Sequence, residues 1–207
     1  MNRLSRHTRV QILHMLCEGS SIRGTSRVTG CSKNTIVKLL VDAGRLCSDY
    51  QDKMLRNLKT RRLQVDEIWS FCYAKKKNVG AAKAAPEGAG DVWTWTALDA
   101  DSKLLITWLV GTRSHECANA FIMDLAGRIP HKGVQLSSDA NAVYADAIDF
   151  AFGPAIHYGQ VVKAYDATST GYVDENSPAP DEWIYKTRIS GKPIEKHIST
   201  STLSDTT

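Results

Sequence analysis

Two aspartates occupy positions at which a carboxylate needs a partner. Asp66 lies at the centre of Leu63–Tyr73, an apolar, β-branched and aromatic stretch that predicts a buried strand. Asp139 follows residues 134–138, a short run that predicts another strand, so Asp139 is expected at the end of that strand. Because an unpaired carboxylate is costly to bury, an acid at either place needs a metal ion, another partner or access to water.

Neighbouring strands in a mixed sheet would bring Asp66 and Asp139 together, and their charges would repel unless a cation lay between them. Carboxylate oxygens favour Mg²⁺ or Mn²⁺, and two such ions can activate a water or a 3′ hydroxyl on a phosphodiester. For each residue alone a simpler role exists: Asp139 can cap the helix that follows it, and Asp66 can pair with a nearby lysine. The two acids together favour the metal site, with Glu67 expected on the opposite face of its strand.

The elements around these acids predict an α/β domain. Strands are expected at 63–73, 91–98, 104–110, 134–138 and within 155–164, and helices at 114–129 and 141–152. The order βββαβαβ indicates a mixed sheet with helices packed on it. The Ala- and Gly-rich segment Gly80–Gly90 is expected to be a hairpin loop.

Residues 5–44 contain three short helical patterns, with a tight turn at Gly30 and Cys31 between the second and the third. Ser32 is expected to cap the third helix and Gly44 to end it. This arrangement is typical of a helix-turn-helix that binds duplex DNA, and an ordinary three-helix cap is the alternative. The residues expected to contact bases or phosphates are Arg23, Arg27, Ser32, Lys33, Asn34, Thr35 and Lys38.

Charge is unevenly distributed along the chain, although the net charge is only +4. Residues 1–62 hold 13 Lys and Arg against 4 Asp and Glu, a net of +9, and the remainder holds 13 against 18, a net of −5. A basic small segment beside an acidic larger one favours nucleic-acid contact at the N-terminal side. We expect a DNA-binding domain over 1–44, a basic connector helix over 45–62 and a larger domain over 63–207.

Composition argues against membrane and disulfide-rich classes. No apolar run approaches the roughly 20 residues of a membrane span, and no apolar signal core follows the N-terminus. The five cysteines include no Cys-x-x-Cys pair, so neither a zinc ribbon nor a disulfide framework is indicated. We therefore expect a cytoplasmic protein with reduced thiols and no membrane partner.

Several segments together resemble the transposases of bacterial insertion sequences, of the type carried by the first-described such element. They are Val65–Phe71, Trp93–Asp99 and Ser138–Tyr144, continued by 21–40, 186–188 and 196–201. The resemblance implies a ribonuclease H-like fold in which Asp66 and Asp139 are the first two of three catalytic acids. It further implies Mg²⁺ or Mn²⁺ in a two-metal arrangement, binding to terminal inverted repeats and target DNA, self-association on DNA, and a location at the bacterial nucleoid.

The third acid implied by the resemblance is a glutamate in a helix after Ser201. Residues 202–207 read Thr-Leu-Ser-Asp-Thr-Thr, so we expect a truncated or frameshifted ending and impaired DNA cleavage and strand transfer. The acids considered as replacements are Glu175, Glu182, Glu195 and Asp205. One alternative function is a non-catalytic DNA-binding protein that represses transposition. Another is a nuclease for RNA–DNA hybrids, against which the helix-turn-helix pattern argues.

Overall fold

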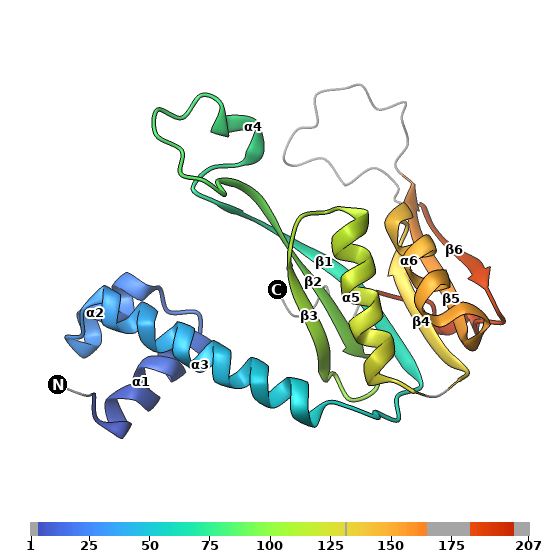
Figure 1. Cartoon of the computed structure of the whole chain (residues 1–207), viewed down its shortest axis with the longest axis horizontal. Coiled ribbons are helices and arrows are strands. Elements are labelled where there is room, and N and C mark those ends of the chain that lie inside the picture. The colour runs from blue at the N-terminus through green and yellow to red at the C-terminus, as the bar shows by residue number, and fades with distance from the viewer. Residues whose placement is uncertain (1–3, 131, 165–182, 201–207) are drawn as a thin grey trace. The chain divides into compact units, whose positions relative to one another are not determined.

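The computed structural model describes residues 4–130, 132–164 and 183–200 (Figure 1). Contacts divide the chain into an N-terminal unit that ends at Leu55 and a sheet unit that begins at Arg56. Three of the acids considered as replacements lie outside the described residues: Glu175, Glu182 and Asp205. Among the described residues, no helix is long and apolar enough to cross a membrane.

The N-terminal unit contains three helices, α1 (Arg6–Cys17), α2 (Ile22–Thr29) and α3 (Lys33–Met54). Each begins after a serine whose hydroxyl accepts a backbone N–H three residues later: Ser5 from Thr8, Ser21 from Gly24 and Ser32 from Thr35. Gly30 ends α2 with a φ of 70°, a conformation that glycine adopts without a steric penalty. Ile12 of α1 and Ile36 of α3 are fully buried and form the apolar centre of this unit.

The predicted end of the third helix at Gly44 is wrong, because α3 continues through this residue to Met54. A glycine inside a helix costs about 1 kcal/mol relative to alanine, which the good helix formers around it can offset. Residues 45–54 therefore belong to α3, and the segment from Leu55 to Arg61 is not helical. The predicted separate connector helix over 45–62 is corrected accordingly.

The sheet unit contains six strands in one mixed sheet. They are β1 (Arg62–Cys72), β2 (Gly90–Asp99), β3 (Leu105–Gly111), β4 (Val134–Asp139), β5 (Ile156–Ala164) and β6 (Trp183–Ser190). Their spatial order is β3-β2-β1-β4-β5-β6. The pairs β1–β4 and β4–β5 are parallel, and the other three neighbouring pairs are antiparallel. The structure thus has the expected α/β class and mixed sheet.

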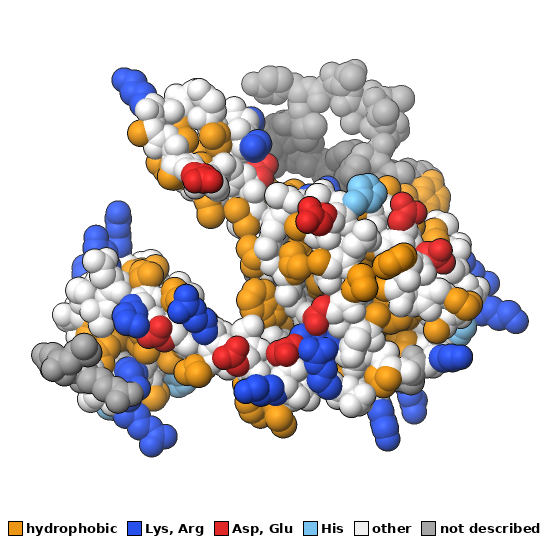
Figure 2. All heavy atoms as spheres, viewed as in Figure 1, with side chains coloured by type: hydrophobic (Ala, Val, Ile, Leu, Met, Phe, Trp, Pro, Cys, Tyr) orange, Lys and Arg blue, Asp and Glu red, His pale blue; other side chains and the backbone are white. Residues whose placement is uncertain are grey.

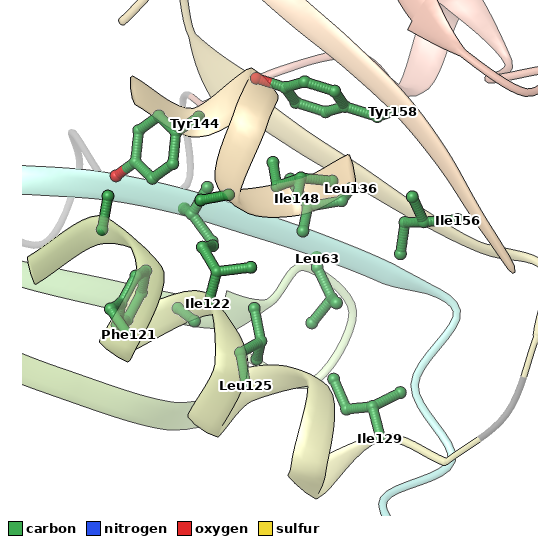
Figure 3. Close-up of a cluster of buried hydrophobic side chains, with 14 of the residues drawn as sticks. Leu63, Phe121, Ile122, Leu125, Ile129, Leu136, Tyr144, Ile148, Ile156 and Tyr158 are labelled. Carbon is green, nitrogen blue, oxygen red and sulfur yellow. The ribbon is translucent and has the colours of Figure 1, made fainter. Parts of the chain in front are cut away.

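Two long helices, α5 (His115–Arg128) and α6 (Ala142–Phe152), supply side chains to the core on one face of the sheet, called here the helix face (Figures 1 and 3). Their apolar residues pack against Leu63, Val65 and Leu136, all of which are 1% exposed or less. The predicted order βββαβαβ is present. The short helix α4 (Lys76–Val79), the strand β6 and two 3₁₀ turns at Gly153–Ala155 and Glu195–His197 were not predicted.

The segment from Gly191 to Ser199 packs on the sheet at β4 and β5. Gln135 of β4 accepts the Ile194 N–H and donates to the Ile194 carbonyl, at 2.8 and 3.0 Å. Ile198 is completely buried, and a Cβ added at Gly159 of β5 would lie 2.5 Å from its Cδ1 atom. Gly159 therefore provides the space into which Ile198 packs.

We predict that Gly159→Ala destabilises the sheet unit by about 1–3 kcal/mol, because the added methyl group overlaps Ile198. Denaturant unfolding followed by tryptophan fluorescence measures this, since all five tryptophans lie after Arg56. Gly80→Ala is the matched control, because nothing lies within 4 Å of a Cβ there and its φ is −65°. Equal unfolding midpoints for the two variants would contradict the proposed packing.

Candidate metal centre

The parallel pairing of β1 and β4 brings the two predicted aspartates together. Gln64 pairs with Ser137, so Asp66 and Asp139 each lie two residues further along their strands. One carboxylate oxygen each from Asp66, Glu67 and Asp139 lie within 4.8 Å of one another. We call these three residues the acid cluster.

Glu67 is the unexpected member of the acid cluster, although it lies on the predicted face of β1, opposite to Asp66. Its backbone position does alternate with that of Asp66, because Glu67 pairs with the buried Trp95 and faces the helix side. Its long side chain nevertheless reaches the end of β4. The Glu67 side chain is 2% exposed, and its Oε1 accepts the Asn141 Nδ2–H at 2.7 Å.

Backbone N–H groups hold the two aspartates. Asp66 Oδ1 accepts the Glu67 N–H at 2.8 Å, and Asp139 Oδ1 accepts the Asn141 N–H at 3.1 Å. The residue that caps α6 is Asn141, whose side chain accepts from Val143 N–H at 3.4 Å. The alternative role of Asp139 as the helix cap is therefore wrong.

Arg113 forms ion pairs with two members of the acid cluster, Glu67 and Asp139. Its Nη2 atom lies 3.5 Å from Glu67 Oε2 and 3.8 Å from Asp139 Oδ2. The guanidinium also lies over the Trp93 ring, 4.9 Å from the centroid. Arg113 was not predicted, because it precedes Ser114, the cap of α5, in a segment whose pattern indicates only a helix start.

The acid cluster retains excess negative charge. Burial raises the pKa of Glu67, and the neighbouring Asp139 charge raises it further. Hydrogen bonding to Asn141 and the charge of Arg113 lower the pKa without cancelling the increase. The buried Tyr144 hydroxyl interacts with Glu67 outside good hydrogen-bond geometry, and burial first and then the acids raise the pKa of Tyr144 well above its usual value.

The chemistry of the donor set fits a hard divalent cation. Three carboxylates converge: the Glu67 side chain is 2% exposed, whereas that of Asp139 is 40% exposed and open to solvent. Oxygen-only ligands suit Mg²⁺ or Mn²⁺ better than softer metals. A cation would also offset the burial and the Asp139 repulsion that together raise the pKa of Glu67.

The residues predicted to contact DNA lie on α2 and at the start of α3. They are Arg23, Arg27, Ser32, Lys33, Asn34, Thr35 and Lys38. Lys33 and Asn34 are exposed, whereas Ser32 and Thr35 hydrogen-bond to each other at 2.8 Å. Lys38 forms an ion pair with Asp42 at 2.7 Å, with both side chains well exposed. Their contact with DNA remains a prediction.

Comparison with known proteins gives a distant structural similarity. No protein-family model and no curated protein matches the chain. Among solved structures, a piggyBac transposase synaptic complex with hairpin DNA is similar at a TM-score of 0.40 and 8% identity. The similarity covers 85% of this chain and 46% of that chain, so this chain spans less than half of the transposase.

We predict that Glu67 makes the sheet unit less stable as pH rises in the absence of divalent metal. An unfolded Glu titrates near pH 4.5, and the folded pKa is higher. The stabilising effect of the bound proton is therefore complete below about pH 4.5 and is lost as pH rises through the folded pKa. Denaturant unfolding from about pH 4 to pH 8 in a chelator measures this loss.

Glu67→Gln serves as the comparison, because the amide retains an acceptor for Asn141 and does not ionise. The variant should gain stability relative to the parent as pH rises. Saturating Mn²⁺ should reduce the difference by stabilising the ionised parent. A difference between parent and variant that is independent of pH would show that burial and the Asp139 charge do not raise the pKa of Glu67 in the folded protein.

Proposed function

We propose that this chain is a transposase-type DNA-processing protein that holds a divalent cation at the acid cluster. The observation that supports this most directly is the convergence of Asp66, Glu67 and Asp139 within 4.8 Å, where β4 ends beside the middle of the parallel strand β1. The sequence segments around Asp66 and Asp139 are the ones that resemble insertion-sequence transposases. The sheet order β3-β2-β1-β4-β5-β6 is compatible with the ribonuclease H-like fold that this resemblance implies.

The residues of the acid cluster would have distinct tasks. Asp66 and Asp139 would bind the cation with the oxygens that face the cluster, and Asn141 would orient Glu67 as a third ligand. When bound, Mg²⁺ or Mn²⁺ supplies activation of a water or 3′ hydroxyl and charge neutralisation on a phosphodiester. Arg113 lies close enough to contact a phosphate oxygen at the same place.

The N-terminal unit would bind duplex DNA as a helix-turn-helix. Its support is the succession of α2, a glycine turn and α3, with Lys33 and Asn34 exposed in the first turn of α3. Arg23 and Arg27 are exposed on α2, where they suit backbone phosphates. The proposed partners are terminal inverted repeats and target DNA, with self-association on the DNA.

A second candidate is a non-catalytic DNA-binding protein that occupies the ends of an element. The specific observation in its favour is Arg113, a cation of the protein itself that already lies within 4 Å of Glu67 and Asp139. A guanidinium in this position offsets part of the charge that a metal would neutralise. A chain that relied on Arg113 alone would bind DNA without requiring a metal.

We predict that Asp66→Asn and Asp139→Asn each weaken Mn²⁺ binding by at least about 100-fold, because each removes a charged ligand. Isothermal titration calorimetry on the full chain measures this without DNA. A strand-transfer assay on terminal-repeat DNA with Mg²⁺ measures function. Cleavage or joining that disappears in both variants supports catalysis.

Asp146→Asn is the matched control, since Asp146 lies on α6, is exposed and is not part of the acid cluster. It should leave Mn²⁺ affinity within about twofold of the parent. Tight, salt-dependent DNA binding without metal-dependent cleavage would favour the second candidate. Equal Mn²⁺ binding by the parent, Asp66→Asn and Asp139→Asn would exclude the acid cluster as the metal site.

A further inference from the structure

β1 continues past the acid cluster. Its last residues, the start of β2 and the segment 73–90 between them form what we call the arm, which carries exposed aromatic side chains. β1 and β2 extend beyond the end of α5 toward α4 (Figure 1). On the face of Glu67, the next positions along β1 are Trp69 and Phe71, and Trp93 lies directly opposite Trp69 on β2. We call Trp69, Phe71 and Trp93 the aromatic track.

The aromatic track presents ring surface to solvent. Trp69 is 40% exposed and Phe71 is 47% exposed, and their ring centroids lie 5.7 Å apart. Trp93 is half-buried. Hydrophobic side chains are visible along the arm on the face shown in Figure 2. Contiguous exposed aromatic residues indicate a binding surface more often than isolated ones do.

Cations lie over the two tryptophan rings of the aromatic track. Lys75 Nζ lies 4.9 Å from the centroid of the Trp69 ring, and Arg113 Cζ lies 4.9 Å from that of Trp93. The segment 73–90, which joins the two strands, contains four lysines against one acidic residue. Aromatic rings beside positive charges are the combination that binds single-stranded nucleic acid.

We propose that the aromatic track binds an unpaired segment of a DNA strand. Bases would stack on Trp69 and Phe71, and phosphates would contact Lys75 and Arg113. In a closed duplex the base faces are already stacked, so exposed ring surface favours a strand whose bases are unpaired. The choice of DNA as the nucleic acid rests on the proposed function.

The charge of the arm favours this occupant over a second copy of the chain. Two arms packed against each other would bring Lys75, Lys76 and Lys77 of both copies together, and like charges destabilise such a contact. A DNA strand instead offers one negative charge per nucleotide next to these lysines.

The aromatic track lies next to the acid cluster, and this position indicates which DNA it would bind. Trp69 follows Glu67 by two residues on the same face, a spacing of about 7 Å along the strand. Arg113 contacts both the acid cluster and the Trp93 ring. A base stacked on Trp69 would therefore lie beside the phosphate at the acid cluster, so DNA that is opened next to the reacting phosphate would be the preferred substrate.

The test is oligonucleotide binding by the full chain in a chelator, so that neither metal binding nor cleavage is required. Fluorescence anisotropy with a labelled strand of about 15 thymidines provides the affinity. Trp69→Ala and Phe71→Ala should each weaken binding about tenfold, because each removes one stacking surface. Lys75→Gln should reduce the slope of log affinity against log salt by about 0.7.

Trp108→Ala is the matched control. Trp108 is 42% exposed on β3 and pairs with Thr96, which pairs with Asp66, so it lies on the opposite face of the same sheet. The affinity of Trp108→Ala for the strand should be within about twofold of that of the parent. Trp69→Phe retains a ring and should bind within about threefold, which separates loss of stacking from loss of folding.

Strand binding within about twofold of the parent in both Trp69→Ala and Phe71→Ala would overturn the proposal. The proposal would also be overturned if sedimentation showed that the parent is a dimer and Trp69→Ala a monomer while strand binding is unchanged. That result would assign the aromatic track to self-association. Strand binding is measured in a chelator and Mn²⁺ binding is measured without DNA, so failure of the metal site and failure of the aromatic track give different results.

Discussion

The parallel pairing of β1 and β4 is the constraint on which the sheet unit depends. Parallel strands cannot be joined by a tight turn, so the chain must pass through β2, β3 and α5 before it returns beside β1. Leu63 pairs with Leu136, and both are buried on the helix face. Because apolar packing sets this register, Asp66 within β1 and Asp139 at the end of β4 must lie near each other.

Arg113 does not restore the usual pKa of Glu67 where these acids meet. Arg113 is one positive charge against three carboxylates, and the pKa of Glu67 stays raised in spite of it. A cluster kept only for stability would be expected to have its charges paired or replaced by apolar residues. Retained repulsion at the solvent-accessible end of a sheet is more typical of a site that binds a cation or a reacting group.

The order of strands and helices was predictable from the sequence, because strands and helices each produce a characteristic spacing of buried apolar residues. The strands and helices around Asp66 and Asp139 followed from that pattern, and the proximity of the two acids followed from the prediction that their strands are neighbours. The role of Glu67 was not predictable from alternation, which describes where a side chain leaves the backbone and not how far it reaches. The end of α3 was missed because Gly44 is a helix stop only when it adopts a left-handed φ, which a sequence does not reveal.

One buried residue connects the core to both functional surfaces. Trp95 is fully buried against Phe121 and Tyr144, and its Nε1–H donates to the Thr112 carbonyl at 3.1 Å. That hydrogen bond holds the backbone immediately before Arg113, so a rigid core side chain positions the guanidinium between the acid cluster and the Trp93 ring. Since β1 and β2 also supply Glu67, Trp69 and Trp93, a small shift in their pairing would move the acids and the rings together. The geometry of both surfaces therefore depends on how well this part of the core is packed.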